Sequence, residues 1–116
     1  MPSQPFPAMW VRAALVAQAL AHPMRLALLE AIGDQGAYVM DLVQALARPQ
    51  PHISRQLAVL REAGLVTTER RGTYIHYRLA EGVPELLAAL GGVAEALPPQ
   101  VGSGPEGPEA GPPRRW

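Results

Sequence analysis

Hydrogen-bonding side chains are concentrated in one short stretch of the sequence. The stretch begins after Arg48 and carries amide, imidazole, hydroxyl and guanidinium groups: Gln50, His52, Ser54, Arg55 and Gln56. Amide groups pair with the major-groove edge of adenine, and guanidinium groups pair with guanine. The cluster therefore predicts contacts with duplex DNA. We expect Gln50, Ser54, Arg55 and Gln56 to contact bases.

Arginines surround this stretch and make it locally basic. The whole chain is neutral, with ten basic and ten acidic residues. Between Arg48 and Arg78, however, six arginines face only two glutamates, a net charge of +4 in 31 residues. Neutralising phosphates supplies most of the affinity of proteins for DNA. We expect phosphate or minor-groove contacts from four residues, which are Arg48, Arg70, Arg71 and Thr73. For His52 or Thr73 alone, a solvated side chain is the better interpretation.

Other chemistries lack the residues they need. The chain has no cysteine, which excludes disulfides, thiol catalysis and thiolate metal sites. Its three histidines fall on separate expected elements, which does not favour a metal site. There is no paired-carboxylate motif, no glycine-rich phosphate loop and no serine–histidine arrangement. We therefore predict no enzyme activity, no cofactor and no bound metal.

Hydrophobic periodicity and turn residues divide the chain into elements that position these groups. Helices are expected over residues 8–21, 24–32, 39–47, 51–63 and 84–97, and strands over 65–69 and 74–79. Ile53, Leu57 and Leu60 share one face of the fourth helix, so the polar residues between Ile53 and Arg61 lie mostly on the other. The turn of the hairpin is placed at residues 70–73. The order of four helices, a hairpin and a helix predicts a mainly α fold with a small β-hairpin, the winged helix-turn-helix.

The first expected helix is apolar around nearly its whole circumference, with only Arg12 and Gln18 polar. A helix of this kind must be covered on more than one side. In a chain of 116 residues, a second copy of the chain is the best candidate for the missing cover.

The two ends of the chain differ from its centre. We expect an irregular arm over residues 1–7, one domain over 8–97, and a disordered tail rich in proline and glycine over 98–116. The start shows no signal peptide, and no stretch approaches the ~18 apolar residues of a membrane span. A cytoplasmic protein without membrane contact is the expectation.

Three motifs in this order resemble the ArsR/SmtB family of transcriptional repressors. The segment from Ala19 to Leu26, A-L-A-H-P-M-R-L, is similar to the family's A-L-A-D-P-T-R-L, with His22 at the usual aspartate. Leu60 to Val66 reads L-R-E-A-G-L-V as in the family, and Arg71 to Leu79 is similar to its wing pattern R-x-G-x-x-x-x-Y-x-L. The resemblance covers residues 10–97.

The resemblance implies a homodimer that binds operator DNA and releases it when an inducer, often a metal ion, binds. Family members pair through the first and last helices. The interface residues implied here are apolar and lie on those helices: Trp10, Val11, Ala14, Leu15, Leu87, Leu90, Val93 and Leu97.

The sequence departs from the family at the positions that bind inducers. Metal-sensing relatives carry C-x-C-D-L where this chain has Tyr38 to Leu42, so both thiols are missing. The last helix offers Glu85 and Glu95 without the histidine of zinc-binding relatives. The effector therefore remains open. Pro49 and Pro51 also replace hydroxyl residues at the start of the DNA-reading helix, where they remove a side-chain cap.

Two interpretations of the function remain. The first is a sequence-specific DNA-binding regulator, a repressor released by an effector, in which residues 51–63 enter the major groove. The alternative is a winged helix that binds another protein and has no operator. That alternative needs neither a polar reading face nor a basic wing.

Overall fold

Aliphatic side chains from all five helices and the sheet form the centre of the fold. A computed structural model describes residues 5–99. The helices are α1 (Ala8–Leu20), α2 (Pro23–Ile32), α3 (Val39–Leu46), α4 (Gln50–Glu62) and α5 (Val83–Ala96). The strands are β1 (Ala37–Tyr38), β2 (Val66–Arg71) and β3 (Tyr74–Leu79). The predicted order of elements is confirmed. Most of the expected tail lies outside the described residues.

The predicted apolar face of α4 is the most deeply buried part of the helix. Ile53, Leu57 and Leu60 are fully buried and pack with leucines of α2 and α3. Their spacing of four and three residues places them on one side. The opposite side of α4 is consequently left in solvent.

Polar caps begin the second and third helices. The Nδ1 atom of His22 accepts a hydrogen bond from the backbone N–H of Met24, at 3.1 Å. His22 thus performs the capping role that an aspartate would perform there. Asp41 accepts a hydrogen bond from the backbone N–H of Tyr38, at 2.9 Å, and caps α3.

Prolines begin α4 without a side-chain cap. Pro49 is the N-cap residue and Pro51 lies in the first turn, where a missing N–H costs little. The carbonyl of Pro49 accepts hydrogen bonds from the N–H groups of His52 and Ile53, at 3.0 and 3.1 Å. The two prolines are therefore compatible with a regular start of the helix.

The sheet is larger than the expected hairpin. Its three antiparallel strands lie in the order β1-β3-β2, and the two-residue β1 was not predicted. The predicted turn at residues 70–73 was too long, because Arg71 pairs with Tyr74 and leaves only Gly72 and Thr73 between the strands. Gly72 has a φ of +65°, as two-residue hairpin turns favour. We call the hairpin formed by β2 and β3 the wing.

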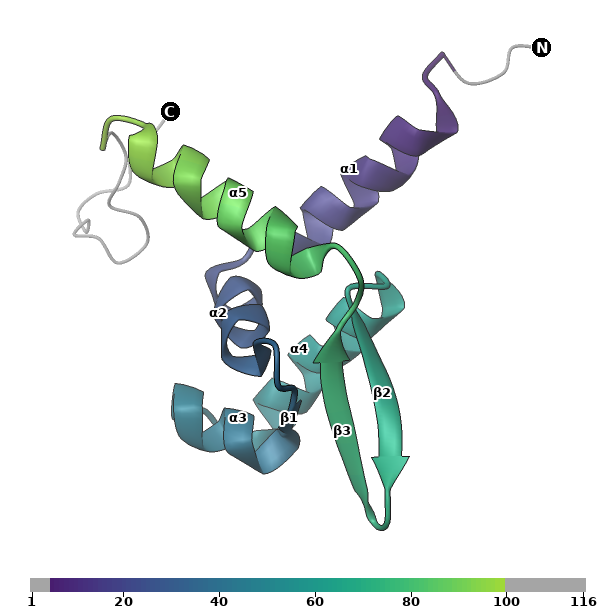
Figure 1. The fold of residues 1–116 in the computed structure, drawn as a ribbon, viewed down its shortest axis with the longest axis vertical. Coiled ribbons are helices and arrows are strands. Elements are labelled where there is room, and N and C mark those ends of the chain that lie inside the picture. Colours follow the sequence, from purple (N-terminus) through teal and green to yellow (C-terminus); the bar gives the residue numbers. More distant parts are fainter. Residues whose placement is uncertain (1–4, 100–116) are drawn as a thin grey trace.

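The helices α1 and α5 diverge from the rest of the fold. Figure 1 shows the two helices as the arms of a V above α2, with the wing at the opposite end of the molecule. Within residues 5–99, none of the helices is by itself long and apolar enough to cross a membrane. The apolar surface of both arms is described with the site below.

A close contact joins the turn before β1 to β3. His76 is 4% exposed, and its ring lies edge-on to that of Tyr38 with centroids 4.8 Å apart. Gly36, with a φ of +80°, lies under the imidazole, where a Cβ would overlap with Cε1 of His76 and come within 2.9 Å of the Tyr77 carbonyl. This position therefore needs glycine for its conformation and for its space.

Gly36 and Gly64 give a matched test of this packing. Both have a positive φ, +80° and +82°, but a Cβ at Gly64 meets no atom within 4 Å. Gly64→Ala should lower the free energy of unfolding by about 1–2 kcal/mol, the cost of the left-handed conformation. Gly36→Ala should lower it by roughly 2–5 kcal/mol because the overlap adds to that cost. Urea denaturation measures both, and equal losses would contradict the contact.

Candidate nucleic-acid interface

The solvent-facing side of α4 carries most of the predicted base-reading residues. Gln50 is the first residue of the helix and is exposed, as are Ser54 and Arg55. Arg55 makes no hydrogen bond to the residues that the structure describes, so its donors are free for a ligand. These three side chains are therefore exposed to solvent, whereas the apolar side of α4 is buried in the core.

Gln56 and His52 lie on the flank of α4 and not on its outer face. Gln56 is half-buried, and its Oε1 accepts a hydrogen bond from Nε of Arg25 at 2.9 Å. Paired recognition of adenine needs both ends of the amide, and here one end is occupied. His52 is also half-buried and lines a hollow of about 420 Å³ with His22 and Arg48.

The wing presents its predicted contacts to solvent. Arg70, Arg71 and Thr73 are all exposed. Arg71 is held by two partners: Nη2 lies 3.1 Å from a carboxylate oxygen of Glu69, and Nη1 donates to the Tyr38 hydroxyl at 3.4 Å. The hydrogen bonds to Tyr38 and Glu69 raise the pKa of Arg71 above its usual value. These contacts direct the guanidinium group of Arg71 toward Tyr38 at the start of α3.

A groove of about 630 Å³ connects the wing to the start of α4. Gln50 and Thr73, predicted from separate elements, both line it. Its walls also include Tyr38 and Met40, which stand at the two positions of the missing thiols, and Tyr74, whose ring is edge-on to that of Tyr38 at 6.1 Å. The sequence analysis did not assign Tyr38 and Tyr74 to the site. Aromatic residues at a helix start and beside a hairpin turn were the available signal.

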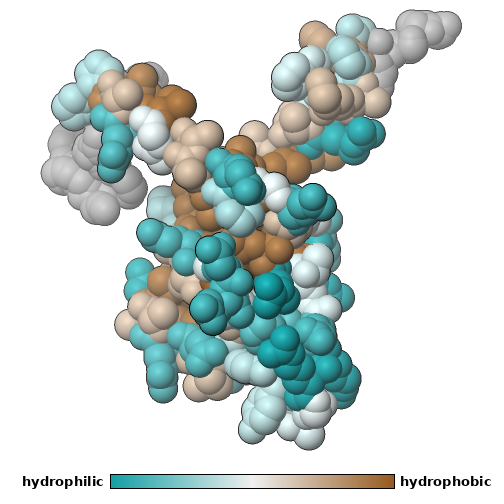
Figure 2. Space-filling view, in the orientation of Figure 1, coloured by the Kyte–Doolittle hydropathy of each residue, from teal (hydrophilic) through white to brown (hydrophobic). Residues whose placement is uncertain are grey.

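Among the described residues, most arginines near α4 and the wing carry a charge that no carboxylate neutralises. Within residues 5–99 the structure has one ion pair, between Arg71 and Glu69. The guanidinium groups of Arg48 and Arg78 donate only to backbone carbonyls, those of Leu46 and Asp34. Figure 2 shows hydrophilic residues covering the wing end of the molecule, whereas hydrophobic residues gather toward α1 and α5. The cationic end is therefore suited to a polyanion.

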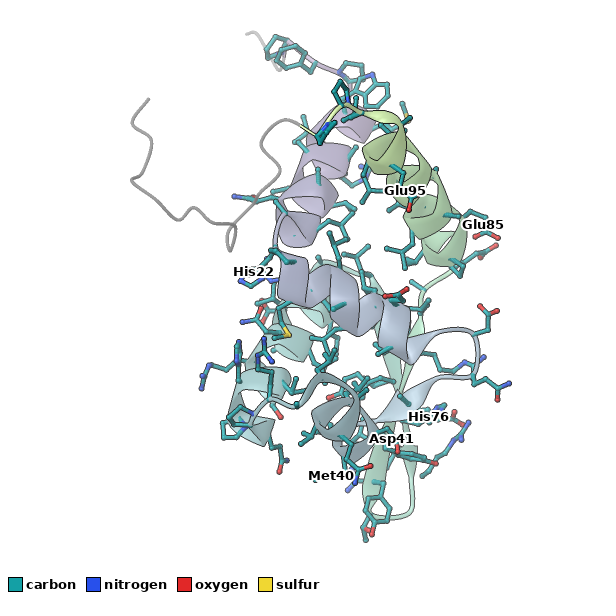
Figure 3. The ribbon with its side chains drawn as sticks, turned by 90° about the vertical axis from the view of Figure 1, so that its left-hand side faces the viewer. His22, Met40, Asp41, His76, Glu85 and Glu95 are labelled. Carbon is teal, nitrogen blue, oxygen red and sulfur yellow. The ribbon has the colours of Figure 1, made fainter. Side chains whose placement is uncertain are left out.

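The possible metal ligands are dispersed. Figure 3 shows His22 and the α5 residues Glu85 and Glu95 well away from Met40, Asp41 and His76. No group of three histidine, aspartate or glutamate side chains within residues 5–99 could hold a metal ion together. Asp41 already caps α3. The expectation of no metal site stays a prediction.

An apolar surface covers the arms of the V. We call its large exposed side chains the pairing face: Trp10, Val11, Leu15, Leu90, Val93 and Leu97. Ala14 is exposed between them. Leu87, also predicted for the interface, instead packs in part against the core of its own chain. Trp10 and Leu15 are about 60% exposed, at 59% and 60%, which is unusual for side chains of this size.

Comparison with known proteins gives consistent results. Residues 20–69 match the family model described as a helix-turn-helix domain. The chain is 46% identical over 80 residues to the biofilm growth-associated repressor of Agrobacterium fabrum, which covers 66% of this chain and 68% of the repressor. It is 40% identical over 72 residues to the arsenical resistance operon repressor of Escherichia coli, covering 61% of this chain and 62% of that protein.

A solved structure supports the same conclusion. The solution structure of a homodimeric winged helix-turn-helix DNA-binding domain from Mycobacterium bovis, a possible ArsR-family regulator, superposes with a TM-score of 0.71. It is 32% identical, and the match covers 82% of this chain and 91% of that one. With the fold and the three motifs, these matches show that the chain belongs to the ArsR/SmtB family of winged helix-turn-helix transcriptional regulators.

Proposed function

We propose that this protein is a transcriptional repressor that binds operator DNA as a homodimer. In this proposal α4 enters the major groove and the wing lies along the adjoining backbone or minor groove. The observation that carries it is the set of exposed polar and cationic side chains on α4 and on the wing, which lie on either side of a largely aromatic groove that Gln50 and Thr73 both line. A winged helix that bound only proteins would not require these free arginines.

The proposed DNA contacts fall into two classes, contacts to bases and contacts to the sugar-phosphate backbone. Ser54 and Arg55 on the outer face of α4, with Gln50 at its start, are proposed to read bases. Arg48, Arg70, Arg71 and Thr73 are proposed to hold the sugar-phosphate backbone, which fixes position without reading sequence. His52 is proposed to contribute from the flank of the helix, whereas Gln56 is proposed to hold Arg25 instead of a base.

A second copy of the chain is proposed to cover the pairing face. Exposed apolar side chains on both α1 and α5 would leave water when two such faces meet, and burial of apolar surface drives association. The homodimeric state of the Mycobacterium bovis domain supports this arrangement. Pairing would present two copies of α4 to the two half-sites of one operator.

We propose that release from DNA depends on an effector whose binding does not require cysteine thiolates. The chain has no cysteine, and the positions of the family's thiol pair hold Tyr38 and Met40. Arsenic, cadmium and lead prefer thiolate ligands, so the chemistry at those positions has changed.

Replacing Arg55 tests the reading face. Arg55→Ala should weaken binding to a selected operator by about 1–3 kcal/mol and relax the base preference at one position. Arg12→Ala, an equal loss of charge on α1, is the control and should leave that preference intact. Fluorescence anisotropy with the operator and its single-base variants measures both. Unchanged base preference in Arg55→Ala would exclude this assignment.

Replacing Arg71 and Glu69 tests the wing with effects of opposite sign. Arg71→Ala should weaken binding to every sequence and reduce the slope of log affinity against log salt by about one. Glu69→Gln should strengthen binding to every sequence, because it removes a carboxylate that competes with phosphate for Arg71. Anisotropy titrations on operator and random duplexes between low and moderate salt measure the slopes. Identical slopes in all three proteins would contradict a phosphate contact by Arg71.

A charge placed on the pairing face tests the dimer. Val93 is 60% exposed, and Val93→Asp should yield a monomer that loses most of its affinity for a duplex with two half-sites. Ala88→Asp adds the same charge about 140° around the same helix and should stay dimeric. Sedimentation velocity gives the mass of each protein. A Val93→Asp protein that sediments as a dimer would show that this face is not the interface.

A further inference from the structure

The side chain of Arg25 connects α1 to α4. We propose that Arg25 is a positioning residue that sets the angle between these helices and thereby the distance between the two reading helices of the dimer. This inference rests on the proposed function, because it concerns how two copies of α4 fit one operator.

The contacts of Arg25 involve both helices. Its Nε donates to Oε1 of Gln56 on α4 at 2.9 Å, and its Nη1 donates to the carbonyl oxygen of Ala19 on α1 at 3.1 Å. Ala19 lies in the last turn of α1, where carbonyl oxygens lack partners within the helix and favour a positive charge. The guanidinium group is planar, so it holds its two acceptors in a fixed relation.

Apolar packing holds the near end of α1, where Ala19 and Leu20 join the core. Within residues 5–99, however, no other side-chain hydrogen bond links α1 to the rest of the fold. An open groove of about 830 Å³ separates α1 from α4, and its walls include Val16 of α1 and Val59 of α4. Within residues 5–99 no hydrogen bond runs directly from α1 to α4, so the polar connection between them passes through Arg25. The helices α1 and α2 meet at 93°, so α1 projects away from the core at its far end. Arg25 is half-buried at this corner.

The geometry amplifies small changes at this corner. A helix of 13 residues is about 20 Å long at 1.5 Å per residue. A change of about 10° in the tilt of α1 would move its far end by about 3.4 Å, roughly the rise of one base pair. Because α1 carries part of the pairing face and both copies in a symmetric dimer would tilt, a tilt of this size would change the separation of the two reading helices by up to about two base pairs.

The sequence contained a signal for this role. Arg25 is the only basic residue between Arg12 and Arg48, and it lies in a segment otherwise made of apolar residues. A long cation with few acidic neighbours in sequence needs acceptors from elsewhere in the fold. Here those acceptors come from the two helices that the dimer and the DNA use.

The test measures how binding depends on the spacing between half-sites. A duplex with two half-sites is selected from a random pool with the unmodified protein, and versions with one or two base pairs added or removed, together with a single half-site, are prepared. Arg25→Ala and Gln56→Met each remove one end of the contact. Each should lower affinity for the selected spacing about tenfold, flatten the spacing preference, and leave single half-site affinity unchanged.

Three controls separate positioning from general damage. The double variant should lose no more than Arg25→Ala alone, because that variant already removes the contact to Gln56. Gln56→Glu keeps an acceptor for Arg25 and should retain the spacing preference. Arg12→Ala, which removes a cation from the same groove, should retain it also.

Different results would contradict the positioning role of Arg25 and the proposed function. A sharp optimum at the original spacing in both Arg25→Ala and Gln56→Met would overturn the positioning role while leaving operator binding intact. Failure of the unmodified protein to select any duplex would instead remove the proposed function, and this inference with it.

Discussion

The buried face of α4 is the constraint on which the rest of the molecule depends. Ile53, Leu57 and Leu60 are fully removed from water, so the helix has one orientation in the fold. That orientation places Ser54 and Arg55 in solvent and leaves Gln56 on the flank, within reach of Arg25. The direction of every proposed base contact follows from three aliphatic side chains. Local apolar packing thus determines the orientation of the polar surface.

The sequence predicted the helices and the wing because their signals are local. Prolines, glycines and the spacing of apolar residues mark where each element begins and ends, and the observed bounds differ from the expected ones by at most two residues. The two-residue strand β1 could not be predicted, since only its pairing with His76 and Tyr77 of β3 defines it. Its short extent leaves no periodic pattern to detect.

The candidate site was predicted less completely than the fold, for a related reason. Which residues lie on α4 follows from the sequence, but which of its flanks is occupied depends on neighbours distant in the chain. Gln56 is engaged by a residue 31 positions away, and Leu87 packs in part against the core of its own chain. The groove that unites Gln50 with Thr73 also depends on how close β3 lies to α3. Such contacts are properties of the folded chain.

The Glu69–Arg71 pair has a consequence for how the protein would find its target. A regulator meets a vast excess of unrelated genomic sequence, to which it binds through charge alone. The carboxylate beside Arg71 offsets part of that attraction at every site equally. Under the proposed function, it would shorten each stay on an unrelated sequence and speed transfer along the chromosome, while the proposed hydrogen bonds from α4 would still prolong the stay at the correct sequence. A negative charge on the wing would in this way favour a rapid search for the operator over prolonged binding to unrelated DNA.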